Sequence, residues 1–139
     1  MLKIRIRNRT RKRLPIRKIR AILRRIIENE IGEIVVDVFF VGEKTIADLN
    51  QTFRKIKGST DVLTFVYKED PYGEVFICPA VIERNARSYN CSFEEELFRV
   101  VVHAALHLAG FDHELNEKGS KEMFQKQEGY LKEAELYDR

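Results

Sequence analysis

Residues 93–113, FEEELFRVVVHAALHLAGFDH, combine a long apolar segment with all three histidines of the chain. The part from 93 to 109 is apolar around most of its circumference at helical spacing, so we expect a central, buried helix. Ser92 precedes this helix and Glu95 follows three residues later, which is the capping-box pattern of a helix N-terminus. Gly110 can take a left-handed conformation and end the helix. The pattern therefore predicts that this helix is the centre of the fold.

The three histidines are His103, His107 and His113. Residues four apart in a helix leave the same face about one turn, or roughly 6 Å, apart, so the first two can bind one metal ion. After the turn at Gly110, His113 can return toward the pair as a third nitrogen ligand. Three imidazoles commonly bind Zn²⁺, and catalytic sites leave the fourth position to water or substrate. We predict one zinc ion, although such sites also accept nickel, copper and iron, and the alternative is structural histidines held by hydrogen bonds.

The histidine spacing also matches the zinc-peptidase signature H-E-x-x-H-x-x-G-x-x-H. In those peptidases the glutamate after the first histidine is the general base, whereas this chain has Ala104. Alanine can neither accept a proton nor orient a water, so a peptidase of this type would lack its base. A zinc peptidase-like hydrolase is therefore an alternative hypothesis.

The basic residues are concentrated at the N-terminus. The chain has 25 Lys and Arg against 22 Asp and Glu, and residues 1–25 hold twelve of the basic residues and no acidic one. A basic segment on an otherwise acidic body indicates a polyanionic partner, most often a phosphate backbone, although a solvated charged face is the alternative. No apolar run approaches the roughly 20 residues of a membrane span, and the N-terminus has no apolar signal segment, so we expect a cytoplasmic protein.

The remaining pattern predicts short strands and amphipathic helices. Strands are expected at 2–7, 33–41, 61–67 and 74–79, and further helices at 15–31, 43–54, 79–89 and 116–137. The third and fourth strands should pair as a hairpin. The first of these helices has a basic face that could lie on a membrane, but its apolar stripe suits the domain's own core. We predict one α+β domain over residues 1–139, with a four-stranded mixed β-sheet covered by about five helices.

Two segments together resemble the YbeY family of metal-dependent endoribonucleases. HAALHLAGFDHE, from residue 103, is similar to that family's H-G-x-L-H-L-x-G-Y-D-H, and LNQTFRKIKGSTDVLTF, residues 49–65, is similar to L-N-x-x-[FY]-R-x-x-D-x-P-T-D-V-L-S-F. The departures are Ala104, Phe111, Lys57 and Ser59, and none of them removes a metal ligand. The order of elements and the chain length also fit the family, so the resemblance covers the whole chain.

Arg54 matches the functional arginine of that family. Phosphodiester cleavage builds up negative charge on the non-bridging oxygens, and a guanidinium can bind two of them in a planar fork. We therefore expect Arg54 to be catalytic, although an arginine at a helix end is by itself usually a surface residue. Asp112 either orients a histidine ligand or caps the turn.

The resemblance implies a zinc-dependent single-strand endoribonuclease that acts in ribosomal RNA processing and ribosome biogenesis. The expected partners are RNA, as ribosomal RNA precursors, and the small ribosomal subunit, with no membrane and no DNA. A non-catalytic RNA- or ribosome-binding protein with a structural zinc is a second alternative. The sequence does not indicate the oligomeric state, or whether the nucleophile is water or a 2′-hydroxyl.

Overall fold

The computed structural model describes residues 1–68, 70–111 and 117–135, and they form one α+β domain. In chain order the elements are β1 (Leu2–Asn8), α1 (Ile16–Glu30), β2 (Ile34–Phe40), α2 (Glu43–Leu49), the π-helix η1 (Asn50–Arg54), β3 (Val62–Tyr67), β4 (Tyr72–Ile77), α3 (Pro79–Ser88), α4 (Phe93–Leu108) and α5 (Glu117–Glu135). The predicted fold class, with a four-stranded mixed sheet and five α-helices among the described residues, is confirmed. The π-helix that continues α2 was not predicted.

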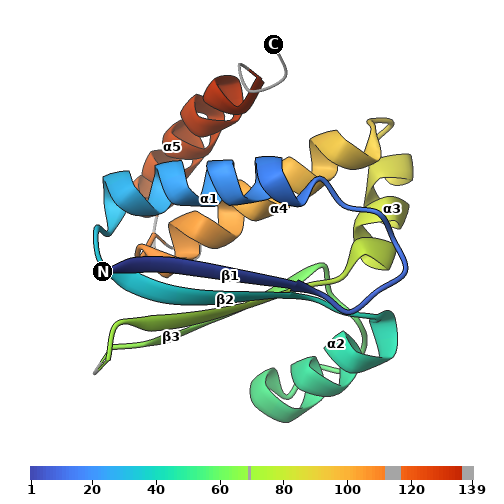
Figure 1. Ribbon diagram of the computed structural model, residues 1–139. Coiled ribbons are helices and arrows are strands. Elements are labelled where there is room, and N and C mark those ends of the chain that lie inside the picture. The colour runs from blue at the N-terminus through green and yellow to red at the C-terminus, as the bar shows by residue number, and fades with distance from the viewer. Residues whose placement is uncertain (69, 112–116, 136–139) are drawn as a thin grey trace.

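The four strands are ordered β1-β2-β4-β3. β2 pairs in parallel with both β1 and β4, and β3 pairs with β4 as the predicted antiparallel hairpin. Parallel neighbours need long crossover connections, which α1 supplies between the first two strands. The helices α1, α4 and α5 lie over one face of the sheet, and α2 lies under one end of the other face (Figure 1). The sheet therefore separates the histidine-bearing helix from α2.

Helix α4 is the central element, as predicted. Its inward residues are fully buried: Leu97, Val101, Val102, Ala104, Ala105 and Leu106. The capping box at its start is present, with the Ser92 hydroxyl oxygen accepting a hydrogen bond of 3.1 Å from the backbone N–H of Glu95. A cap of this kind contributes about 1 kcal/mol to helix stability.

The end of α4 packs directly on the sheet at Gly73 of β4. A Cβ atom at this glycine would lie 2.5 Å from Cδ2 of Leu108, so any larger residue would force the Leu108 side chain to move. Leu108 is the last residue of α4 and follows His107 directly. The packing against β4 thus fixes where the histidine-bearing turn lies above the sheet.

Helix α1 packs its apolar stripe into the same core, which supports the core interpretation over a membrane-bound helix. Ile19, Leu23 and Ile26 are buried, and Pro15 is the N-cap rather than the first helical residue. None of the described helices is long and apolar enough to cross a bilayer.

Candidate metal centre

His103 and His107 lie on the last two turns of α4, and their imidazoles converge. Their Nε2 atoms are 2.9 Å apart, and the ring centroids are 4.5 Å apart. Two nitrogens that bind one zinc ion at roughly 2.0 to 2.1 Å lie about 3.3 Å apart in a tetrahedral site. A small rotation of either ring reaches that separation. The donor set therefore fits a shared divalent ion, and both side chains are half-buried.

Gln127 of α5 contacts the His103 ring at Nδ1, on the side away from His107. Its Oε1 lies 3.1 Å from Nδ1 of His103. An amide oxygen only accepts hydrogen bonds, so in this arrangement Nδ1 carries the proton and the lone pair is on Nε2. Metal-binding histidines commonly donate their second nitrogen in this way, which fixes the tautomer and the ring orientation. Gln127 therefore prepares Nε2 of His103 as a ligand.

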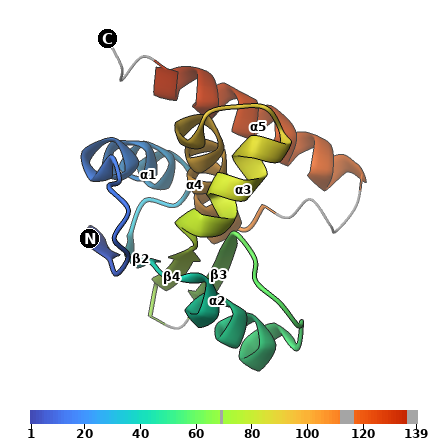
Figure 2. The same ribbon diagram turned by 90° about the vertical axis from the view of Figure 1, so that its right-hand side faces the viewer.

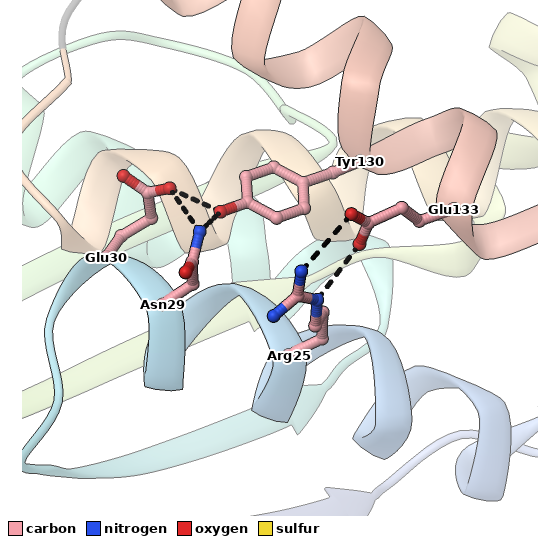
Figure 3. Close-up of polar contacts among 5 residues, drawn as sticks. All are labelled: Arg25, Asn29, Glu30, Tyr130 and Glu133. Atoms are coloured by element: carbon pink, nitrogen blue, oxygen red, sulfur yellow. Dashed lines mark hydrogen bonds and ion pairs between the residues drawn. The ribbon is translucent and has the colours of Figure 1, made fainter.

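Polar interactions with the end of α1 hold α5 in place (Figure 3). The Tyr130 hydroxyl donates to the Glu30 carboxylate and accepts a hydrogen bond of 2.6 Å from Asn29. Arg25 pairs with Glu133 at 3.1 Å. These interactions lie along the face of α5 that meets α1, and they fix the position of α5 and hence of Gln127.

Glu30 is almost fully buried, with 8% of its side chain exposed, and it also pairs with Nζ of Lys126 at 3.1 Å. Burial alone would raise the pKa of Glu30, but the hydrogen bonds from Tyr130 and Lys126 outweigh burial and lower it. The carboxylate is therefore charged at neutral pH, which strengthens its bonds to α5.

The turn after α4 has the predicted glycine geometry. Gly110 has φ +95°, and the backbone N–H groups of Gly110 and Phe111 donate to the carbonyls of His107 and Leu106, at 3.0 Å each. This is the Schellman arrangement, which reverses the chain direction at a helix end. His113 and Asp112 lie outside the described residues, so the third ligand stays a prediction. Within the described ranges no group of three or more metal-binding side chains occurs.

Arg54 ends η1, on the other face of the sheet from α4. The next residue, Lys55, is left-handed, with φ +59°, and Nδ2 of Asn50 donates to the carbonyl of Gly58 at 2.9 Å, which shapes the following loop. Arg54 is exposed and forms no hydrogen bond or ion pair with any residue that the structure describes. The structure thus brings His103 and His107 together but shows no contact between them and Arg54.

The segment after η1 and the end of α4 lie on opposite faces of the sheet. Figure 2 shows the segment after η1 below the sheet and α4 above it.

The sequence comparisons identify the family of this chain. The sequence model of the family described as "Endoribonuclease YbeY" matches residues 5–135. A protein of that name from Thermotoga maritima is 51% identical over 113 residues, which are 81% of this chain and 75% of the relative. Another from Chlorobium luteolum is 34% identical over 139 residues, covering 95% of this chain and 98% of the relative.

A solved structure has the same fold. The solution structure of TM1509 from Thermotoga maritima superposes with a TM-score of 0.72 at 46% identity, covering 94% of this chain and 88% of that one. The chain belongs to the YbeY family of endoribonucleases. Membership implies a hydrolase with nuclease activity whose substrate is RNA.

Sequence reasoning missed Gln127, although a signal was present. Met123, Gln127, Tyr130 and Ala134 recur at helical spacing, and the three apolar members are buried. A polar residue inside an apolar stripe needs a partner, and here the partner is a predicted metal ligand.

Proposed function

We propose that this protein is a zinc-dependent endoribonuclease that cleaves single-stranded RNA during ribosomal RNA maturation. The observation that carries the proposal is the convergence of the His103 and His107 Nε2 atoms, with Gln127 setting the tautomer of the first ring. Membership of an endoribonuclease family supports RNA as the substrate. The ribosomal RNA precursor and the small ribosomal subunit are the partners that the motif resemblance implies.

His103 and His107, with His113 as the predicted third ligand, would hold the zinc ion. A bound zinc ion supplies Lewis acidity, which polarises a phosphate oxygen or lowers the pKa of a bound water. The buried body of α4 keeps the two imidazoles in one orientation, and Gln127 prevents rotation of the first. Such preorganised ligands do not have to be reordered when the substrate arrives.

Arg54 would stabilise the negative charge that develops on the phosphate during cleavage. It is exposed and has no charged partner among the described residues, so its guanidinium is available to a substrate. An RNA strand that contacts both Arg54 and the histidine pair would have to pass the edge of β3. The catalytic assignment rests on the exposure of Arg54 and on the motif match.

The test uses zinc-loaded protein and an end-labelled single-stranded fragment of a ribosomal RNA precursor. His103→Ala and His107→Ala should lose zinc and cleavage together. Arg54→Ala should keep zinc and melting temperature but cleave about 30- to 1000-fold more slowly, which corresponds to about 2 to 4 kcal/mol. Arg87→Ala, which removes an exposed arginine of α3, is the matched control and should cleave like wild type.

Each rival hypothesis predicts a different result. A peptidase would digest an unstructured protein such as casein and leave the RNA intact. A non-catalytic protein with structural zinc would bind zinc and RNA without zinc-dependent cleavage by a preparation free of other nucleases. Stoichiometric zinc in the histidine variants, or undiminished cleavage by Arg54→Ala, would refute the corresponding assignment.

A further inference from the structure

Aromatic side chains line up across the face of the sheet opposite α4. Phe39 of β2 stacks on Phe76 of β4 with ring centroids 5.1 Å apart. Phe65 of β3 meets Phe76 edge-on at 6.1 Å, and Phe53 of η1 meets Phe65 edge-on at 5.4 Å. The four rings form a continuous row from the middle of the sheet to the residue beside Arg54.

The strand register places basic side chains at the other end of this row. Arg7 of β1 is opposite Phe39, and Phe39 is opposite Phe76, so the three share one face. Lys3 and Arg5 alternate with buried or partly buried residues on the same strand and point the same way, as the sequence pattern predicted. The face therefore changes from basic to aromatic across the strands.

A second aromatic pair lies nearer the β3–β4 turn. Tyr67 and Tyr72 stack with centroids 5.6 Å apart, and both line a surface groove there. Asp37 accepts hydrogen bonds from Arg5, at 2.5 and 2.8 Å, and from the Tyr72 hydroxyl, at 2.6 Å. Asp37 thus neutralises the charge of Arg5. It also accepts the hydrogen bond of the Tyr72 hydroxyl, and this contact does not cover the face of the Tyr72 ring.

The remaining charges on this face are mainly positive. Arg9 lies over the Phe39 ring at 4.8 Å. Lys3, Arg7 and Arg9 are exposed and form no ion pair with the residues that the structure describes. Glu74 supplies a negative charge on the same face, and its carboxylate accepts a hydrogen bond of 2.9 Å from the Tyr67 hydroxyl. The face thus keeps a net positive charge next to the rings.

The aromatic rings are only partly covered. Ile46 of α2 packs with Leu63 and Val41 in a small separate core, and α2 lies under that one end of the sheet (Figure 1). Phe53 is 62% exposed and Tyr67 49% exposed. Exposed aromatic rings beside exposed cations are the features of surfaces that bind single-stranded nucleic acids, where bases stack on rings and cations hold phosphates.

We propose that this aromatic–basic sheet face is a binding surface for single-stranded RNA, separate from the metal centre. The face comprises Lys3, Arg7, Arg9, Phe39, Phe53, Phe65, Tyr67, Tyr72 and Phe76. Phosphates pair with the β1 cations and unpaired bases stack on the exposed rings. Duplex RNA does not fit, because its base faces are covered by stacking within the helix. The inference rests on the proposed function only in taking RNA as the substrate.

The position of this face explains how bound RNA reaches the proposed catalytic groups. The aromatic row ends at Phe53, next to Arg54, on the side of the edge strand β3. On the opposite face, α4 contacts β3, and Leu108, directly after His107, lies against Gly73 of the neighbouring strand β4. A strand that leaves the sheet face at Phe53 meets Arg54 first, and the edge of β3 is its route to the face that carries the histidines.

The test measures binding of a fluorescent 12-nucleotide single-stranded RNA by anisotropy. The full-length protein is freed of metal with a chelator, and circular dichroism checks that it stays folded. The Phe53→Ala, Tyr67→Ala double variant should bind at least tenfold more weakly than wild type. Binding of an abasic oligomer of equal length should not change. The double variant Phe124→Ala, Lys121→Ala, on the exposed face of α5, is the control and should bind like wild type.

The contribution of the basic residues of this face is measured separately, from the salt dependence of RNA binding. In the Lys3→Ala, Arg7→Ala variant the slope of log K against log salt should flatten by about 0.7 for each phosphate that is no longer neutralised. With zinc-loaded protein both double variants should raise KM more than they lower kcat. Unchanged RNA affinity in the aromatic variant, or an equally large decrease in the α5 control, overturns the proposal.

The RNA-binding results for the sheet face can be told apart from the results of the cleavage test. If the aromatic variant binds normally while the histidine and Arg54 variants lose cleavage, the sheet face is refuted and the proposed function stands. If zinc-dependent cleavage is absent but the aromatic variant binds RNA more weakly, the surface stands and the catalytic proposal fails.

Discussion

Replacing Gln127 with leucine should weaken zinc binding without removing a ligand. Leucine has nearly the same size, but it cannot accept the 3.1 Å hydrogen bond from Nδ1 of His103. The ring can then move its proton to Nε2 and rotate away from His107. Removal of such a partner typically lowers metal affinity by about tenfold to a hundredfold, which is about 1.4 to 2.8 kcal/mol. The upper part of that range is expected, because the ring is half-buried and water replaces the amide poorly.

Zinc competition against a chromogenic chelator gives the affinity, and nitrogen NMR of the metal-free protein gives the His103 tautomer. Gln125→Leu, two residues away on the exposed face of α5, is the matched control and should bind zinc like wild type. Gln127→Leu should also shift the His103 tautomer signals while the helical signal by circular dichroism stays constant. Wild-type affinity in Gln127→Leu, or an equal decrease in Gln125→Leu, would refute the orienting role.

The fold makes further predictions about stability. The pKa of Glu30 lies below its ordinary value of 4.5, so its bonds to α5 contribute fully above pH 4.5 and are lost as pH falls through the lowered pKa. Melting temperatures measured from pH 7 to pH 3 should therefore fall more steeply for wild type than for Glu30→Gln, and parallel curves would contradict this. Gly73→Ala should destabilise the protein by about 1 to 3 kcal/mol in urea unfolding, because its Cβ would meet Leu108. Gly129→Ala, on α5 with no heavy atom within 4 Å of the new Cβ, should instead stabilise it by about 0.5 to 1 kcal/mol.

Local patterns predicted the elements of this fold because each pattern has one structural solution. The apolar circumference of residues 93–109 is compatible only with a buried helix, and the structure has α4 from Phe93 to Leu108. The capping box and Gly110 set its two ends, as expected. The alternation of residues 2–7 likewise predicted β1 and the outward direction of its basic residues.

Features that depend on packing between distant segments were not predictable in the same way. The strand order β1-β2-β4-β3 depends on β4 pairing with β2, which is distant in the sequence, and no single segment encodes that pairing. The basic side of α1 makes contacts with two other helices: Arg25 pairs with Glu133 of α5, and Lys18 lies 4.4 Å from the centroid of the Phe98 ring of α4. The exposed cations of β1 are therefore better placed to hold RNA than those of α1.

The candidate site was predictable to the extent that it is local. The spacing of four residues between His103 and His107 already determined that their rings converge on one helix face. Gln127 follows 24 residues after His103, and the docking of α5 on α4 and α1 brings it to the ring. A sequence pattern shows that such a polar residue needs a partner, but it does not say which one.

This dependence on docking couples the metal centre to the stability of α5. Tyr130 and Glu30 hold the helix in place, and Gln127 lies less than one turn from Tyr130. If zinc binds more tightly when α5 is docked, zinc must stabilise the docked helix by the same free energy, because the linkage is reciprocal. Glu30→Gln should then lower zinc affinity although Glu30 touches neither histidine. Saturating zinc should also slow amide hydrogen exchange in α5 of the wild-type protein, and less so in Gln127→Leu. Exchange in α5 that does not respond to zinc would show that the ligand pair is held by α4 alone.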